Sequence, residues 1–263
     1  MKKQFLAVTV ALLVLLSVTA MASTPPQQAN PGLAGDPGAG RYDQQIQQAV
    51  SHKIQGAKQL QNVSSSVEDG IVTLTGTVGV YQDKLDAAKK IKKVANVAGI
   101  RNDIMVAGAN LPDNQLQQKL AKKLAYDRVG YYDNTFNYLA IGVENGVVTL
   151  TGDAVYDVPL DSALEIVART PGVKDVVNDV KVLPVSMFDD SLRIRTARAI
   201  YRDSVLSRYA NDPVHPIRIV VDHGHVTLYG SVATSMDKTI AGMRASGVPG
   251  AFSVDNKLVI DKS

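Results

Sequence analysis

Asp69-Gly70-Ile71-Val72-Thr73-Leu74-Thr75-Gly76 is an eight-residue stretch that occurs three times in the chain. The second copy is Asn145-Gly-Val-Val-Thr-Leu-Thr-Gly152, and the third is His223-Gly-His-Val-Thr-Leu-Tyr-Gly230. The copies begin 76 and 78 residues apart, which is the length of a small domain. The sequence therefore predicts a tandem array of domain-sized repeats.

Each copy begins with a two-residue turn between runs of alternating apolar and polar residues. The turn pair is Asp-Gly, Asn-Gly or His-Gly. A type I′ turn needs positive φ at both positions, which Asn, Asp and Gly adopt readily and His tolerates. We therefore expect a β-hairpin at each copy, with positive φ at the turn glycines. These glycines are Gly70, Gly146 and Gly224.

The turn also fixes which residues face each other across the hairpin. In the third copy it places Asp222 opposite His225 and Val221 opposite Val226. Alternation then predicts one apolar face and one open face, and the open face carries Asp222 and His225. A glycine closes each copy, where it ends the strand or lets another backbone approach. These closing glycines are Gly76, Gly152 and Gly230.

Amphipathic helices are expected on both sides of each hairpin, because apolar residues recur there at i, i+3 and i+4. The helices before the hairpins span 42–60, 114–125 and 190–205, and those after them span 81–94, 158–169 and 235–245. Asp113 or Asn114, and Asp189 or Asp190, are the expected N-caps. In the third unit the expected buried stripe is Ile194, Ala197, Tyr201 and Val205.

A third strand is expected at the end of each unit, and an Asn lies in phase with its inward-facing residues. An inward Asn without a hydrogen-bond partner costs about 1–3 kcal/mol. We therefore expect these side chains to be buried and hydrogen-bonded within their own units, in a structural role. They are Asn102, Asn178 and Asn256.

The predicted fold class is α+β, with three tandem α-β-β-α-β units. Each unit is expected to be a three-stranded mixed sheet with two helices on one face and a right-handed crossover. The predicted unit boundaries are 42–110, 113–185 and 188–263.

The N-terminal region has the features of an export signal. Lys2 and Lys3 precede an apolar run at 5–18 and a small-residue site at Ala20-Met21-Ala22. Residues 1–22 are therefore interpreted as a cleavable signal peptide, with an uncleaved anchor as the alternative. Residues 23–41, rich in Pro, Gly, Ala and Gln, are expected to form a flexible linker. The export signal predicts a periplasmic or secreted protein. The chain has no cysteine, so its fold uses no disulfide in that oxidising compartment.

The charge pattern argues against a nucleic-acid partner. Without residues 1–22 the chain carries 26 basic and 25 acidic side chains, and the three units carry net charges of +2, −3 and +2. Nucleic-acid binders are usually far more basic. The alternation favours docking between neighbouring units.

Three features together resemble the BON domain, a family of bacterial osmotically induced periplasmic proteins. They are the α-β-β-α-β order, the motif Gly-x-Val-x-Leu-x-Gly that begins at Gly70, and the pattern Val-x-x-Val-Val-Asn-x-Val-x-Val from Val173 to Val182. The resemblance covers nearly everything after residue 42. It implies a non-catalytic binding module, with phospholipid membranes as the usual proposed partner. The third unit departs most, through a longer loop at 207–216 and the His in its turn.

A basic helix in the first unit is the candidate binding surface. Its apolar half is expected to show Leu85, Ala88 and Ile91. Contact with anionic head groups is worth about 1 kcal/mol per basic residue near a charged surface. The alternative is an ordinary solvated helix face. The lysines are Lys84, Lys89, Lys90, Lys92 and Lys93.

Metal binding and catalysis are not predicted. His215, His223, His225 and Asp222 could hold a metal if the 207–216 loop folded inward. The simpler explanation is structural: His223 replaces Asn or Asp in a turn, and His225 replaces Ile71 or Val147 on an open sheet face. The chain has no nucleophile elbow, phosphate-binding loop or cysteine, so we expect no enzyme activity and no cofactor.

Two functions stay open from the sequence. One is a cell-envelope protein that contacts anionic phospholipid or another envelope component in envelope or osmotic stress. The other is a structural or chaperone-like stress protein of the periplasm that binds envelope proteins.

Overall fold

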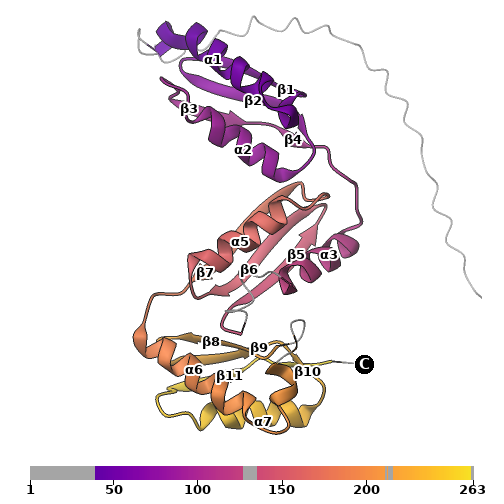
Figure 1. Cartoon of the computed structure of the whole chain (residues 1–263), viewed down its shortest axis with the longest axis vertical. Coiled ribbons are helices and arrows are strands. Elements are labelled where there is room, and N and C mark those ends of the chain that lie inside the picture. Colours follow the sequence, from indigo (N-terminus) through magenta and orange to yellow (C-terminus); the bar gives the residue numbers. More distant parts are fainter. Residues whose placement is uncertain (1–38, 127–134, 211, 213–215, 262–263) are drawn as a thin grey trace, which may run out of the picture. The chain divides into compact units, whose positions relative to one another are not determined.

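A computed structural model of the chain describes residues 39–126, 135–210, 212 and 216–261 (Figure 1). The predicted signal peptide and most of the predicted linker lie outside these residues. Three units of mixed α/β structure follow one another along the chain. Each has a three-stranded core sheet with two helices on one face, which confirms the predicted fold class.

The first unit is built on an antiparallel hairpin, and its third strand runs parallel to the second. After a two-residue break, a short fourth strand pairs in parallel with the end of the second strand, through Thr77–Met105 and Val78–Val106. The elements are η1 (Ala39–Tyr42), α1 (Asp43–Gln55), η2 (Lys58–Leu60), β1 (Val63–Glu68), β2 (Ile71–Val78), α2 (Tyr81–Ile91), β3 (Gly99–Asn102) and β4 (Met105–Val106).

The second unit repeats this plan with an unbroken third strand. Its sheet order is β5-β6-β7, and β7 pairs with β6 over eight consecutive residue pairs. The elements are α3 (Asp113–Ala125), β5 (Tyr138–Glu144), β6 (Val147–Ala154), α5 (Asp157–Ala168) and β7 (Asp175–Val182).

The third unit again has an interrupted third strand. Its sheet order is β11-β9-β8, and β10 pairs with β12 beyond the interruption. The elements are α6 (Met187–Tyr201), η3 (Ser207–Ala210), β8 (Arg218–Asp222), β9 (His225–Tyr229), β10 (Ser231–Val232), α7 (Ser235–Ser246), β11 (Ser253–Asn256) and β12 (Val259–Ile260).

The hairpin turns have the backbone geometry that their residues favour. The turn glycines have φ of 75°, 80° and 80°, and the residues before them have φ of 50°, 54° and 50°. The predicted third-copy register is present, with Asp222 opposite His225. At Gly76 φ is 112°, and an added Cβ would lie 2.0 Å from the Asn62 carbonyl oxygen, so only glycine fits this crossing.

A carboxylate from the first turn of each unit's first helix binds both N–H groups of the hairpin turn. In the third unit, Asp189 accepts hydrogen bonds from the backbone of His223 at 3.0 Å and Gly224 at 2.8 Å. The Asp113 carboxylate does the same in the second unit, at 2.7 and 2.9 Å, and Asp43 in the first, at 2.9 and 2.8 Å.

The expected N-caps are therefore wrong for these helices. Pro112 and Ser186 occupy the N-cap positions, and the Ser186 hydroxyl accepts from the backbone of Asp189. The aspartates sit one to three residues inside the helix, and their carboxylates are directed at a turn far away in sequence. We call this contact the Asp–turn contact.

The strand asparagines behave differently in the three units. Asn102 and Asn256 are half-buried, and their Nδ2 atoms donate to the carbonyls of Lys84 and Lys238 at 2.8 and 2.7 Å, which tie the third strand to the second helix. Asn178 is exposed, so the expectation that all three are buried is wrong. β7 stays paired with β6 beyond Asn178, and among the described residues the Asn178 amide nitrogen donates to no helix carbonyl.

The buried stripe of α6 also differs from the expected one. Leu192, Thr196 and Ile200 are buried, while Ile194 is 44% exposed and Val205 lies beyond the end of the helix. The reason is that α6 begins at Met187, and the Asp–turn contact fixes the rotation of the helix about its axis. The same spacing from the aspartate gives the buried Ile46, Val50 and Ile54 in α1.

The Asp–turn contact gives a direct prediction. Asp189→Ala removes the acceptor of two backbone donors, and Asp189 is only 2% exposed. We expect the free energy of unfolding of the third unit to fall by about 1–3 kcal/mol. Hydrogen exchange of the β8–β9 amides measures this, with the exposed Ser191→Ala as the control. Equal protection in the two variants would contradict the role given to Asp189.

Candidate functional site

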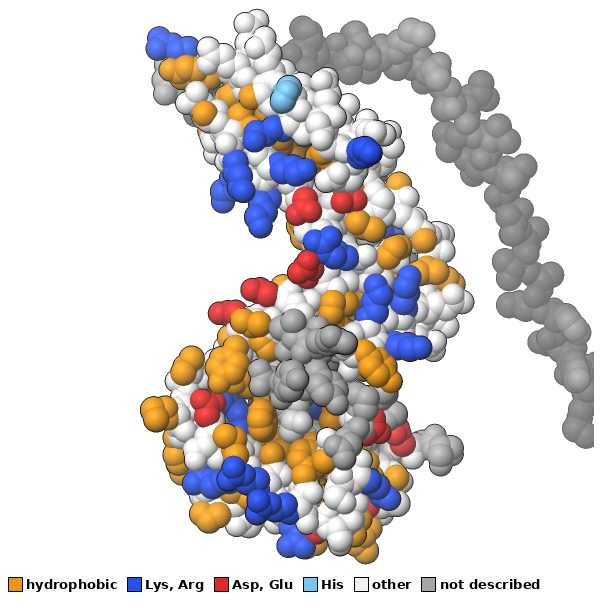
Figure 2. All heavy atoms as spheres, in the orientation of Figure 1, with side chains coloured by type: hydrophobic (Ala, Val, Ile, Leu, Met, Phe, Trp, Pro, Cys, Tyr) orange, Lys and Arg blue, Asp and Glu red, His pale blue; other side chains and the backbone are white. Residues whose placement is uncertain are grey.

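The predicted basic surface lies on and just after α2. Lys89, Lys90, Lys92 and Lys93 are exposed, and Lys84 is half-buried. Figure 2 shows Lys and Arg side chains gathered over this part of the first unit. Within the described residues none of the five forms an ion pair. Their charge is therefore available to an external anion.

The apolar side of α2 matches the expected one at Ile91 but not at Leu85, and Ala88 is half-buried. Ala87 and Ile91 are fully buried, and Val94 after the helix is almost so. Leu85 is 41% exposed, because at 100° per residue it points roughly 160° away from Ala87. The exposed side of α2 therefore carries an apolar side chain as well as the lysines.

A shallow apolar groove of about 460 Å³ borders two of the lysines. Lys89 and Lys92 line the groove and are exposed, and a lysine in such a place can add its apolar stem to the wall while its ammonium group stays in water. The groove offers positive charge beside an apolar surface. Its lining residues are Ala88, Lys89, Lys92, Val97, Ala98, Gly99 and Ile100.

The other two units carry different chemistry at the same positions. The strand asparagines align the repeats, and Lys89 then corresponds to Glu165 in the second unit and Met243 in the third. Lys92 corresponds to Ala168 and Ser246. The basic groove is therefore a property of the first unit and not of the repeated scaffold.

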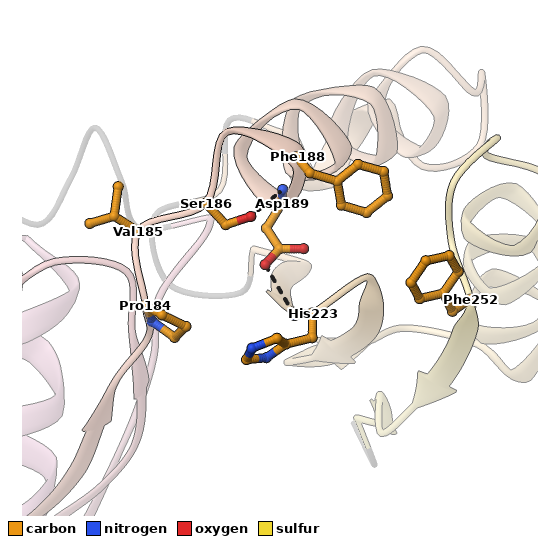
Figure 3. Close-up of a pocket in the computed structure, with 7 residues that line it drawn as sticks. All are labelled: Pro184, Val185, Ser186, Phe188, Asp189, His223 and Phe252. Atoms are coloured by element: carbon orange, nitrogen blue, oxygen red, sulfur yellow. Dashed lines mark hydrogen bonds between the residues drawn. The ribbon is translucent and has the colours of Figure 1, made fainter.

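The third unit has an exposed apolar surface that the sequence analysis missed. Phe188 of α6 and Phe252 of the loop before β11 face each other, with ring centroids 5.9 Å apart (Figure 3). They are 46% and 72% exposed, and Met187 is 89% exposed. A cleft of about 440 Å³ beside the two rings is lined by Pro184, Val185, Ser186, Phe188, Asp189, His223 and Phe252.

Two arginines stand beside these apolar side chains. Arg195 and Arg198 line a second shallow depression with Met187 and Ile194. We call Val185, Met187, Phe188, Ile194, Arg195, Arg198 and Phe252 the apolar–arginine patch. Aligning the repeats on their aspartates would have found it, because that alignment places Ile194 outside the buried stripe.

Among the described residues, His223 and His225 do not converge on one site. His223 Nδ1 lies 2.6 Å from the Asp222 carboxylate, and His225 Nδ1 lies 2.7 Å from the Ser253 hydroxyl. His215 lies outside the described residues. Within the described part of the chain, no three potential metal ligands of the types His, Cys, Asp and Glu cluster together.

A buried polar cluster fixes the long loop of the third unit to α7. The Tyr209 hydroxyl donates to Asp237 at 2.7 Å and accepts from the Ala233 backbone at 2.8 Å, and Arg208 forms an ion pair with Asp237. Burial alone would raise the pKa of Asp237. The hydrogen bonds from Tyr209 and Arg208 outweigh it and hold the pKa below its ordinary value.

All three units match a known family. The family model for the BON domain matches residues 42–108, 112–184 and 199–262, which is more than half of the chain. The third match begins inside α6, so most of the apolar–arginine patch lies outside it. No curated protein matches the chain. No helix in the described ranges has the length and apolar character needed to cross a membrane.

Similarity to solved structures is remote. The C-terminal domain of CdsD, the structural protein of the type III secretion system of Chlamydia trachomatis, is 12% identical. That match covers 81% of this chain and 95% of that chain, with a TM-score of 0.24. The periplasmic domain of PrgH from S. typhimurium is 10% identical. That match covers 81% of this chain and 100% of that chain, with a TM-score of 0.18. Scores this low carry no argument about function.

The polar cluster predicts acid sensitivity of the third unit. A carboxyl with a lowered pKa in the folded state stabilises that state above its unfolded pKa, and the contribution is lost as pH falls through the folded value. We expect the stability contributed by Asp237 to begin to fall below about pH 4, the unfolded pKa, and to be lost as pH passes through the lowered folded pKa. Urea unfolding between pH 5 and pH 3 measures it, and Asp237→Asn should flatten the dependence. Parallel profiles for parent and variant would contradict the assignment.

Proposed function

The chain belongs to the BON-domain family, and from that premise we propose that it is a non-catalytic cell-envelope protein that binds anionic phospholipid surfaces. The binding surface is the basic face of α2 in the first unit. The features of residues 1–22 support a periplasmic or secreted location, and a role in envelope or osmotic stress follows the family resemblance.

The observation that carries this proposal is the combination of unpaired charge and apolar surface at one place. Four exposed lysines on and after α2 have no ion-pair partner among the described residues, and two of them border an apolar groove. A phospholipid interface presents phosphate groups above apolar chains. The lysine ammonium groups can bind the phosphate groups, and the apolar groove can contact the lipid chains.

The chemistry of the described residues gives no support to catalysis. The polar clusters that they form tie structural elements together, as the Asp–turn contacts and the Asp237 cluster do. We expect no cofactor and no nucleic-acid partner.

Vesicle binding tests the proposal. Changing Lys89, Lys90, Lys92 and Lys93 to Gln removes four charges at about 1 kcal/mol each near an anionic surface, so we expect affinity for anionic vesicles to fall about 1,000-fold. Binding by the parent should also weaken steeply with salt, since exposed charges are screened over roughly 8–10 Å at 0.1–0.15 M. Co-sedimentation with anionic and neutral vesicles measures both effects.

A matched control separates this surface from overall charge. Lys53, Lys58, Lys119 and Lys122 are equally exposed and lie on or near other helices. Changing these four to Gln alters the net charge by the same amount and should leave binding nearly unchanged. If both variants bind as the parent does, or both lose binding equally, the α2 surface is an ordinary solvated face.

The second candidate function is binding of exposed protein segments, and the apolar–arginine patch favours it. Large apolar side chains clustered on one unit mark an interaction surface. Arginine next to aromatic rings is common at protein interfaces. This would make the chain a chaperone-like or structural partner of other envelope proteins.

Suppression of aggregation tests this second candidate. We expect Phe188→Ser with Phe252→Ser to reduce, several-fold, the ability of the chain to keep a heat-unfolded client protein in solution. Met105→Ser in the first unit removes an apolar side chain that is also well exposed, at 67%, and is the control. A patch variant that protects the client as well as the parent would rule this candidate out.

A further inference from the structure

The free edge of the second unit's sheet differs from the corresponding edges in the other two units. β7 remains paired with β6 through eight consecutive residues, and no strand pairs with its other side among the described residues. In the first and third units the equivalent strand is interrupted for two residues after its asparagine and then resumes pairing in the same register over only two residues. The second unit alone therefore presents a long, regular strand edge.

The side chains of β7 leave that edge accessible. Asn178 and Asp179 are exposed, and Val177 and Val182 are 41% and 38% exposed. The amide nitrogen of Asn178 has no protein partner among the described residues, whereas Asn102 and Asn256 use theirs to bind a helix. Long exposed edges are templates for pairing with another strand.

The backbone groups at this edge can be assigned. Leu183 donates its N–H to the Ala154 carbonyl of β6, so odd-numbered residues of β7 direct their backbone groups toward β6. The Val180 N–H is instead accepted by the Asn178 side chain at 3.2 Å, and the Val176 N–H by the carboxylate of the residue before it at 2.9 Å. The groups of residues 176, 178 and 180 therefore lie at the free edge. Those of 178 and 180 are contacted there by local side chains alone among the described residues, and the backbone of Val176 also contacts the Tyr81 hydroxyl of α2.

We propose that two copies of the chain associate by antiparallel pairing of β7 with β7, centred on Asn178. In this register the edge groups of Val176 meet those of Val180 in the second copy, and the two Asn178 residues meet each other. Lys181 then lies opposite Asp175 of the second copy, and two-fold symmetry repeats this pair. Opposite charges directly across a strand pair are favourable.

Neighbouring registers are poorer. A shift that centres the pair on Asp179 puts two identical carboxylates opposite each other, which is unfavourable. A further shift, centred on Val180, opposes Asp179 and Lys181 but shortens the overlap by two residues of each strand. The register centred on Asn178 therefore combines full overlap with two opposite-charge pairs.

The interface is small, because a pair of strands alone buries less than the area typical of stable complexes. Association is therefore concentration-dependent. Lys181 also lies 2.6 Å from Asp222, and the Tyr81 hydroxyl interacts with Asp175 and with the Val176 backbone, a contact that pairing at Val176 replaces. Single substitutions at these positions change those contacts too, so the test depends on mixing two variants.

The mixing experiment uses Asp175→Lys and Lys181→Glu in the chain from residue 23 onward. Alone, each variant would place like charges opposite each other twice, and we expect at least a tenfold weaker self-association than in the parent. Mixed in equal amounts, the two variants place the introduced lysine opposite the introduced glutamate, and the native Lys181 opposite the native Asp175. A heterodimer should therefore form with nearly parental affinity. Sedimentation velocity over a concentration series measures all three samples.

Cross-linking tests the register separately. The chain has no cysteine, so a single introduced Cys can form only an intermolecular disulfide. Asn178→Cys places two thiols on the symmetry axis, with Cα atoms about 5.5 Å apart, within disulfide range. Lys174→Cys is also exposed but would lie about 27 Å from its symmetry mate.

We expect rapid oxidative cross-linking of Asn178→Cys and little of Lys174→Cys. Equal cross-linking of the two would overturn the register. A mixture of the charge variants that stays as monomeric as each alone, with circular dichroism unchanged, would overturn the pairing itself.

Discussion

A carboxylate that binds two backbone N–H groups is the interaction on which each unit depends. Asp43, Asp113 and Asp189 lie in the first turn of their helices, and each accepts from both residues of the hairpin turn. The carbonyl of the turn glycine accepts a hydrogen bond from the residue just before the third strand, at 2.9 Å in all three units. The two residues of the hairpin turn therefore connect the first helix to the segment that leads into the third strand. Their positive φ directs their N–H groups to the aspartate and the glycine carbonyl to that segment.

This arrangement lets one scaffold carry three different surfaces. The buried positions that follow the aspartates are apolar in all units, apart from Thr196 in α6. The exposed positions are free to differ. They give lysines beside a groove in the first unit, an unbroken strand edge in the second, and an apolar–arginine patch in the third. If all three units bound the same partner through the same surface, their exposed residues would not need to differ. We therefore look for partners at the surface that is particular to each unit.

The candidate site is predictable in part. The lysines after residue 83 are recognisable from their density, and most of them are exposed because the opposite side of α2 is buried by Ala87 and Ile91. The groove beside them is not predictable, because its other wall comes from residues 97–100, which the fold brings to the end of α2. The apolar–arginine patch was missed because the periodicity of α6 is ambiguous, with apolar residues on more than one side of the helix.

The sequence by itself determined the three repeats, the turn type, the strand register and the α-β-β-α-β order. These rest on local rules: Asx-Gly or His-Gly turns, alternation with a period of two, and helical spacing. Tertiary structure alone decided the rotation of α6 and the exposure of Asn178. The rotation depends on a carboxylate that binds a turn 34 residues away. The exposure depends on whether the third strand stays in its ladder. Both are contacts between segments distant in sequence, and no local pattern encodes them.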